Sequence, residues 1–167
     1  MHAHFVATLA LTLATASAAG AQSAATPEAQ TRTLNLSAYA ELLRGDVRLQ
    51  KVAIITQVME FTEAEDKVFW PIYREYDAEM AKLGDERVAL LAEYARHYDT
   101  LADEVADRLA KTAIDLAVRR QAVEAKYYGR VRAALTPRTA LRYLQVEHQL
   151  LLLVDLQISA ALPIAAK

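Results

Sequence analysis

Apolar residues recur every third or fourth position along most of the chain from Leu34 onward. This period is typical of α-helices that bury one face and leave the other in water. Glycine and proline, with 4 residues each, are scarce and divide the pattern into four segments. The sequence therefore predicts an all-α fold of four helices, with a long antiparallel central hairpin and flanking N- and C-terminal helices.

The first predicted helix runs from about Ser37 to Met59, and Gly45 weakens it by about 1 kcal/mol relative to alanine. Its expected inward positions are Leu42, Leu49, Val52, Ile55 or Ala53, and Met59.

The second predicted helix begins at Thr62 and ends near Tyr98. Thr62 and Glu65 have the spacing of a capping box, in which each side chain satisfies a free backbone amide of the other. Pro71 removes one helical hydrogen bond, so we expect either a kink around it or a restart of the helix there. The expected inward positions are Val68, Ile72, Tyr76, Met80 or Glu79, Leu83, Leu90 and Tyr94.

The third predicted helix runs from about Leu101 to Ala134, with Thr100 as its N-cap because Asp103 follows three residues later. A short turn at Asp99 and Thr100 makes it antiparallel to the second helix. Its expected inward positions are Val105, Leu109, Leu116, Val123, Tyr127 and Val131.

The last predicted helix begins with Thr136 as N-cap and Pro137 at the first helical position, and it continues to Ala161 before Pro163. It carries the most apolar run after the leader, residues 150–154. Glu147, His148 and Asp155 interrupt this run, so we expect no stable membrane insertion. The hairpin or a second copy of the chain would bury the helix, which makes a homodimer possible.

Residues 1–21 have the apolar run and small-residue cleavage site of a secretory signal peptide, which predicts a periplasmic protein. Residues 22–34 are predicted to form a flexible mature N-terminus, and residues 35–163 are predicted to form a single helical domain. The chain has no cysteine, which excludes disulfides, thiolate zinc sites and cysteine nucleophiles. Its formal charge of −2 gives no reason to expect nucleic acid as a partner.

The sequence offers little catalytic chemistry. His97 lies at a predicted helix end, where its positive charge suits the helix dipole, and His148 is expected on a surface or interface. Neither forms a ligand pair at helical spacing. Carboxylate pairs such as Glu75/Glu79 and Asp103/Asp107 are typical of solvated helix faces. We therefore expect no enzyme, no cofactor and no metal site.

Aromatic residues gather in the hairpin. Helical spacing places most of them in the core, and tyrosines in particular suit half-exposed surfaces that bind other proteins. The candidate partner-binding residues are Phe69, Trp70, Tyr73, Tyr76, Tyr94, Tyr98, Tyr127 and Tyr128.

The segments Phe61-Thr62-x-x-Glu65 and Leu135-Thr136-x-x-Thr139 resemble the paired Leu-Thr-x-x-Gln motifs of the Spy/CpxP-like periplasmic helical proteins, with Glu65 and Thr139 in place of the glutamines. The chain is most similar to an exported subset that carries the segment Phe69 to Tyr73. The resemblance covers about residues 36–162. It implies an all-helical, often dimeric protein that acts as an ATP-independent chaperone or stress-signalling adaptor.

Our leading hypothesis is therefore an exported, non-enzymatic protein-binding module, an ATP-independent chaperone or envelope-stress adaptor whose partners are unfolded clients or envelope proteins. The alternative is a metal-responsive periplasmic accessory protein, supported by His97, His148 and the many carboxylates. An enzyme with helix-borne carboxylates would require that these side chains converge in a pocket.

Overall fold

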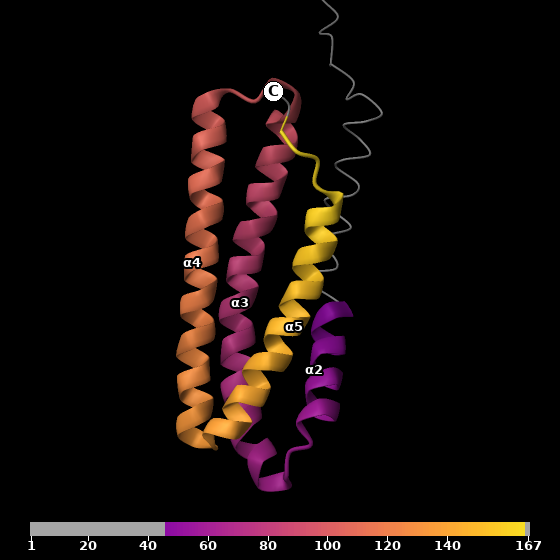
Figure 1. The fold of residues 1–167 in the computed structure, drawn as a ribbon, viewed down its shortest axis with the longest axis vertical. Helices are drawn as coiled ribbons and strands as arrows, with labels where there is room; N and C mark the ends of the chain where they lie inside the picture. Colours follow the sequence, from indigo (N-terminus) through magenta and orange to yellow (C-terminus); the bar gives the residue numbers. More distant parts are fainter. Residues whose placement is uncertain (1–45, 166–167) are drawn as a thin grey trace, which may run out of the picture.

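The computed structural model describes residues 46–165, and these residues form a bundle of α-helices with no strand among them (Figure 1). In chain order the helices are α2 (Asp46–Met59), α3 (Glu63–His97), α4 (Asp103–Ala134) and α5 (Pro137–Ala161). A 3-10 turn, η1 (Tyr98–Thr100), joins α3 to α4. The predicted all-α fold with a long central hairpin is confirmed. None of the helices in this part of the chain is both long and apolar enough to cross a membrane.

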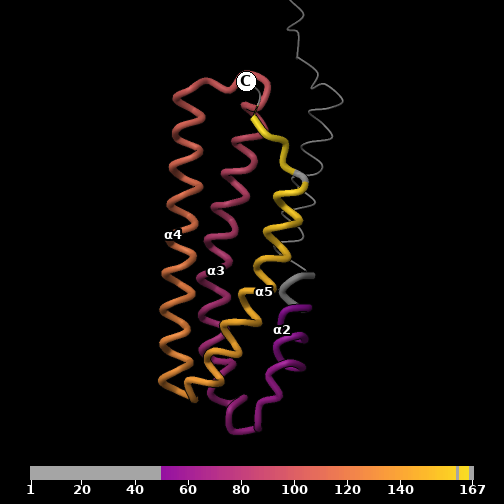
Figure 2. The backbone as a smooth tube through the Cα atoms, in the orientation of Figure 1, coloured from indigo at the N-terminus to yellow at the C-terminus, as the bar shows by residue number. Residues whose placement is uncertain are grey.

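Helices α3 and α4 form the hairpin and run antiparallel over their whole length (Figure 2). Ion pairs bridge the two helices in regular register: Glu75 with Arg130, Glu79 with Lys126, Glu86 with Arg119, and Glu93 with Arg108. Pairs this exposed contribute less than about 1 kcal/mol each. Their regular spacing nonetheless favours one register of the hairpin over its neighbours.

Thr62 is the N-cap of α3, and both halves of a capping box are present. The amide of Glu65 donates to Thr62 Oγ1 at 3.3 Å, and the amide of Thr62 donates to Glu65 Oε2 at 3.0 Å. These hydrogen bonds lower the pKa of the Glu65 carboxyl. Two amides at the start of the helix are thus satisfied within the local sequence.

Thr136 is the N-cap of α5, with Pro137 at the first helical position. The amide of Thr139 donates to Thr136 Oγ1 at 3.1 Å. Proline costs nothing at this position because the first helical amide has no partner in the helix.

Thr100, in contrast, does not cap α4, and its prediction as a helix cap is wrong. It belongs to η1, and the two residues that follow it, Leu101 and Ala102, have extended backbones. The N-cap therefore falls on Ala102, whose methyl group cannot accept a hydrogen bond.

Helix α3 passes through Pro71 without interruption, so the predicted restart at that residue is wrong. Pro71 lies on the exposed side of the helix. There, water can reach the carbonyl of Lys67, which loses its helical partner to the proline. Phe69 and Tyr73, buried on either side of Pro71, anchor the helix to the core across this position.

Two expected inward positions are in fact exposed. Val52 is 41% exposed because α2 buries the face of Lys51, Ile55 and Met59, one position away. Val68 is 38% exposed for the same reason, since its neighbour Phe69 takes the inward position on α3.

Glu60 ends α2 and turns the chain toward α3. Its φ of 51° places it in the left-handed region, and no other non-glycine residue among those described has a positive φ. Glycine usually occupies this place after a helix because it has no Cβ to clash.

An aromatic core fills the lower half of the bundle, where all four helices meet. Tyr76 and Phe69 of α3 and Tyr127 of α4 are its largest fully buried side chains. Tyr143 of α5 packs edge-on against the ring of Phe69, with centroids 5.3 Å apart. Helix α5 reaches α3 through these long side chains, whereas its backbone lies close to α4 and α2.

The predicted signal peptide, the predicted flexible N-terminus and the N-terminal part of the first predicted helix lie outside the described residues. Those predictions, including inward positions for Leu42 and Leu49, therefore remain predictions.

Candidate functional site

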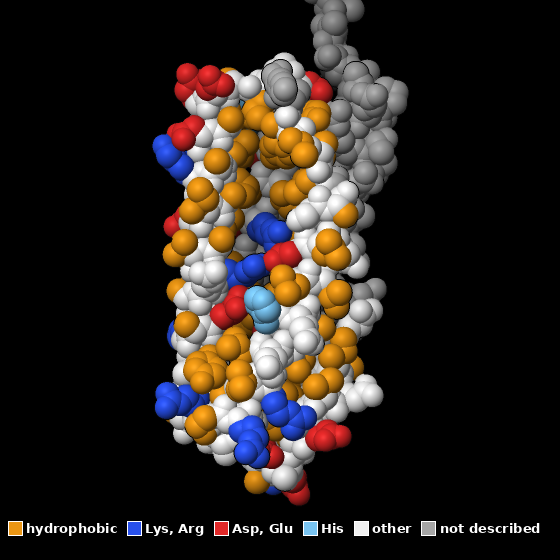
Figure 3. Space-filling view, viewed as in Figure 1, with side chains coloured by type: hydrophobic (Ala, Val, Ile, Leu, Met, Phe, Trp, Pro, Cys, Tyr) orange, Lys and Arg blue, Asp and Glu red, His pale blue; other side chains and the backbone are white. Residues whose placement is uncertain are grey.

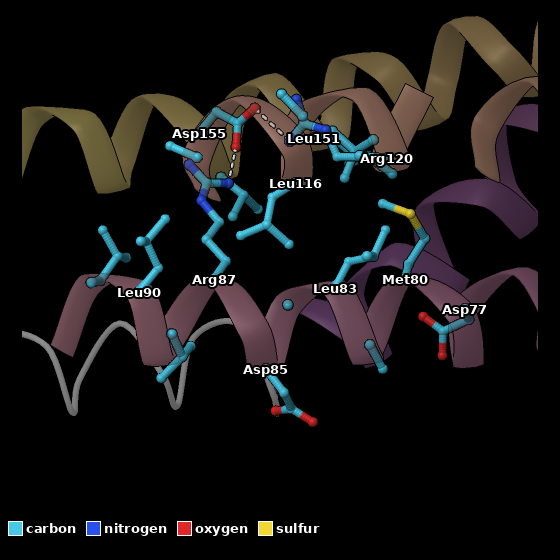
Figure 4. A pocket seen from close by; sticks show the side chains of 18 of the residues that line it. Asp77, Met80, Leu83, Asp85, Arg87, Leu90, Leu116, Arg120, Leu151 and Asp155 are labelled. Carbon is cyan, nitrogen blue, oxygen red and sulfur yellow. Dashed lines mark hydrogen bonds and ion pairs between the residues drawn. The ribbon is translucent and has the colours of Figure 1, made fainter. Parts of the chain in front are cut away.

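A groove of about 660 Å³ opens between α3, α4 and α5 in the upper half of the bundle. Figure 3 shows this half as a hollow between hydrophobic side chains, with basic and acidic side chains together at its lower end. In the close view of Figure 4, Leu83 and Leu90 of α3 face Leu116 of α4 and Leu151 of α5 across the space. Most of the accessible wall is thus aliphatic.

The groove lies where it does because of the side chains between α3 and α5. In the lower half, Phe69, Tyr73, Tyr76 and Tyr143 fill the space between these helices. In the upper half the facing residues are leucines and small residues such as Gly84 and Ala81. Helix α5 slants across the hairpin, so the space is not closed by backbone contact (Figure 1).

Three half-buried charged residues cross the groove. Arg87 of α3 donates to Asp155 Oδ1, and Arg120 of α4 donates to Asp155 Oδ2 at 2.8 Å, as Figure 4 shows. Burial alone would raise the pKa of Asp155, but the hydrogen bonds from the two guanidinium groups outweigh it and lower that pKa. One carboxylate thus holds two cations inside an otherwise apolar groove.

Glu124 stands beside this cluster, with Oε1 3.7 Å from Arg120 Nε. That distance is too long for a hydrogen bond, and no acceptor among the described residues satisfies the buried Arg120 Nε. Burial raises the pKa of Glu124, despite the opposing charge of Arg120.

A second buried polar cluster closes the lower end of the groove. Lys51 Nζ of α2 donates to Glu147 Oε1 of α5 at 2.5 Å, and the hydroxyl of Tyr76 donates to the same oxygen at 2.9 Å. Burial, followed by the charge of Glu147, raises the pKa of Tyr76 far above its ordinary value. The other oxygen, Glu147 Oε2, is buried without a hydrogen-bond partner among the described residues.

Four of the eight candidate partner-binding residues are core residues. Phe69, Tyr73, Tyr76 and Tyr127 are at most 3% exposed. They interlock with one another and with Tyr143, so no partner can reach them without unfolding the bundle. A tyrosine-lined binding face made of these residues is therefore wrong.

The other four candidates are half-buried. Trp70 Nε1 donates to Asp66 at 2.9 Å, and Tyr128 packs against the core. The hydroxyls of Tyr94 and Tyr98 donate to the carbonyls of Pro163 and Ile164, at 2.7 and 3.0 Å. These two tyrosines bind the end of α5 back onto the top of the hairpin, so their polar tips serve the chain itself.

The histidines and paired carboxylates lie apart from one another. His97 forms the last residue of α3, and His148 is exposed on α5. Glu75 and Glu79 pair with Arg130 and Lys126, whose hydrogen bonds lower the pKa of each carboxyl. Within residues 46–165, no three histidine or carboxylate side chains gather closely enough to hold a metal ion. Asp103 and Asp107 are exposed at the start of α4.

The sequence indicated several groove residues as inward positions, among them Leu83, Leu90 and Leu116, but not the groove itself. The missed residues are Arg87 and Asp155. Asp155 interrupts the apolar run of α5, and this interruption was the one available signal.

Comparison with protein-family models, curated proteins and solved structures finds no match to this chain. The site must therefore be interpreted from its own geometry.

Proposed function

We propose that the protein is an exported, non-enzymatic protein-binding module that holds an apolar segment of another polypeptide in the groove between α3, α4 and α5. The observation that carries the proposal is the groove itself, walled by Leu83, Leu90, Leu116 and Leu151. Leu90 and Leu151 are half-buried, whereas Leu83 and Leu116 form the buried floor of the groove. Concave, mostly apolar sites of this size are typical of binding sites.

The expected affinity follows from the size of the groove. Burying one leucine side chain contributes about 1.5–3 kcal/mol, so two or three leucines of a bound segment contribute roughly 3–9 kcal/mol. Association costs at least about 4 kcal/mol in lost translational and rotational freedom. The remainder, at most about 5 kcal/mol, corresponds to weak and reversible binding, with a Kd of a few tenths of a millimolar at best. Such binding suits a holdase or an adaptor that must release its partner.

The cluster of Arg87, Asp155 and Arg120 contributes selectivity more than affinity. A bound segment that placed a charge beside it would have to compete with an existing ion pair, whereas an apolar backbone and side chains only cover it. The groove therefore favours leucine-rich segments whose charged residues stay outside.

The sequence supports the same proposal independently. The resemblance of the two threonine-capped segments to the Spy/CpxP-like motifs implies a chaperone or stress adaptor, and the signal-peptide pattern implies the periplasm. The chaperone or adaptor role and the periplasmic location are both part of the proposal.

The first test uses the mature protein and a chemically denatured client. Near-stoichiometric protein should suppress light scattering by the diluted client without any nucleotide. Absence of suppression across several unrelated clients would remove the chaperone reading.

A matched pair of variants tests whether the groove is responsible. Gly84 lines the groove, and a Cβ added there meets no atom within 4 Å, so Gly84→Phe starts a bulky side chain from an open position in the groove wall. Gly129 lies exposed on α4, also with open space at its Cβ, so Gly129→Phe adds the same ring elsewhere. Gly84→Phe should abolish suppression and Gly129→Phe should retain it. Equal activity of the two variants would place binding outside the groove.

A further inference from the structure

The chain that follows α5 crosses the upper end of the groove. Helix α5 ends at Ala161, and residues 162–165 run from its top toward the end of α3, as Figures 1 and 2 show. The backbone is already extended at Leu162, with φ −85° and ψ 122°. Residues 162–165, which we call the strap, therefore bridge two of the helices that wall the groove.

Two tyrosines at the top of the hairpin hold the strap. The hydroxyl of Tyr94 donates to the carbonyl of Pro163 at 2.7 Å, and the hydroxyl of Tyr98 donates to the carbonyl of Ile164 at 3.0 Å. The two rings meet edge to face, with centroids 5.7 Å apart. A pair of neighbouring hydroxyls thus binds two successive carbonyls of the strap.

Little apolar packing adds to these hydrogen bonds. Pro163 and Ala165 are exposed, and the side chain of Ile164 is 91% exposed. Within residues 46–165, the strap also forms no backbone-to-backbone hydrogen bond outside the helices. A segment with so few buried contacts opens at a much lower cost than the helices that it joins.

Leu162 is the strap residue that lines the groove, together with Leu90 and Leu91 of α3. Leu162 is half-buried there. Leu90 and Leu91 lie one helical turn before Tyr94, so the groove ends directly beside the tyrosine that holds the strap. At this end of the groove, the side chain of Leu162 stands among leucines, where a leucine of a bound segment would otherwise pack.

We propose that the strap is an autoinhibitory gate of the groove. While Tyr94 and Tyr98 hold it, Leu162 fills the upper end of the groove, and release of the strap opens that end to a partner. The inference rests on the proposed function, because it concerns how the same groove takes up its apolar segment. The apparent Kd equals the intrinsic Kd divided by the fraction of molecules with the strap released. Any change that releases the strap must therefore strengthen binding.

Truncation of Leu162 separates a gate from a fixed wall by the sign of its effect. If Leu162 were only part of the wall, Leu162→Ala would remove apolar contact with the bound segment and weaken binding. If Leu162 stands in the place of the partner, the same truncation vacates that place and binding becomes tighter.

A binding experiment on the mature protein tests the gate. The double variant Tyr94→Phe/Tyr98→Phe removes both hydrogen bonds to the strap and keeps both rings. A fluorescently labelled, unfolded polypeptide rich in leucine is the probe, and its anisotropy reports binding. The Kd should fall at least about threefold for the double variant and for Leu162→Ala, because both increase the fraction of molecules with an open groove. An unchanged or higher Kd in either would overturn the proposal.

Tyr128→Phe is the matched control for the tyrosine substitutions. Tyr128 is a half-buried tyrosine of α4 that does not line the groove, and its substitution removes the same kind of hydroxyl. The Kd of this variant should equal that of the unsubstituted protein. A Kd lowered as much as in the double variant would mean that loss of any such hydroxyl loosens the bundle, and this too would overturn the gate.

Cysteine labelling measures the opening of the strap without a client, because the chain has no cysteine of its own. Leu90→Cys places a thiol in the groove next to the strap, and Met80→Cys places one in the groove about 15 Å further down α3. Tyr94→Phe/Tyr98→Phe should accelerate labelling by a bulky maleimide at position 90 at least about threefold and leave the rate at position 80 unchanged. No acceleration, or equal acceleration at both positions, would contradict a gate at the upper end.

The two experiments distinguish this inference from the proposed function. Accelerated labelling at position 90 without polypeptide binding by any variant would contradict the proposed function but not the opening of the strap. Polypeptide binding that is blocked by Gly84→Phe, yet is indifferent to Tyr94→Phe/Tyr98→Phe and Leu162→Ala, would support the proposed function and overturn only the gate.

Discussion

Lys51 and Glu147 form a buried ion pair that joins α2 to α5, with Nζ 2.5 Å from Oε1 and side chains only 9% and 2% exposed. The two residues are 96 positions apart in the sequence. It is a buried polar contact that holds α2 against the bundle at the lower end of the groove, and nearer the end of α2 Arg142 also donates to the carbonyl of Val58 at 2.7 Å.

Lys51→Met should destabilise the protein by about 3–5 kcal/mol, because it leaves the carboxylate of Glu147 buried without its cation. Urea denaturation at pH 7 measures this. The double variant Lys51→Met/Glu147→Gln carries no buried charge there, and its amide oxygen can still accept from Tyr76, so most of the loss should be recovered. A double variant less stable than Lys51→Met would contradict the assignment.

Arg119→Met provides the exposed counterpart. It breaks the pair of Arg119 with Glu86 across the hairpin, in which both side chains are nearly half exposed. The free energy of unfolding should fall by less than about 1 kcal/mol. A cost as large as that of Lys51→Met would mean that the exposed ion pairs, not the buried one, dominate the stability of the bundle.

The three threonines predicted as helix caps should respond differently to alanine. Thr62→Ala and Thr136→Ala each remove a hydroxyl that accepts from a helix amide, and each should cost about 1 kcal/mol. Thr100→Ala should change the free energy of unfolding by no more than about 0.5 kcal/mol, because Thr100 caps no helix. Thermal or urea denaturation of the three variants in parallel measures these losses. Equal losses of stability in all three would contradict the assignment of Thr62 and Thr136, but not Thr100, as helix caps.

Glu60→Gly should stabilise the protein by about 1 kcal/mol, since glycine adopts the left-handed conformation of this residue without strain. The matched control, Glu63→Gly, places glycine in the first turn of α3 and should destabilise. If both variants lose stability, the turn between α2 and α3 does not have the described backbone.

Acid should weaken the protein through Asp155. Its folded pKa is lowered, so its contribution to stability is complete above the unfolded pKa of about 3.9 and is lost as the pH falls through the folded value. Asp155→Asn should therefore be less stable than the unsubstituted protein at pH 7, with the gap narrowing below about pH 4. Urea denaturation at pH 7, 5 and 3.5 measures the gap. A gap independent of pH would argue against the ionised carboxylate.

Local sequence determined much of the fold. The hydroxyls of Thr62 and Thr136 satisfy amides only three residues away, so the starts of α3 and α5 were predictable from short segments. The prediction of Thr100 as a cap failed although Thr100 and Asp103 have the spacing of a capping pair. The backbone stays extended at Leu101 and Ala102, so the helix begins two residues later. Spacing alone cannot reveal that difference.

The groove was not predictable, because it depends on what meets across the bundle. Leu116 and Leu151 looked like ordinary inward leucines, and only the slant of α5 leaves them facing open space. The buried tyrosines show the same limit. The helical period places Tyr76 and Tyr127 on inward faces, but it cannot show whether such a face packs in the core or lines a binding surface.

Direct binding to the groove is the most decisive measurement. A fluorescently labelled, permanently unfolded polypeptide rich in leucine is titrated with the unsubstituted protein, Gly84→Phe and Gly129→Phe, and anisotropy reports the bound fraction. The account predicts weak, sub-millimolar binding by the unsubstituted protein and by Gly129→Phe, and loss of binding by Gly84→Phe alone. Undiminished binding by Gly84→Phe would contradict it.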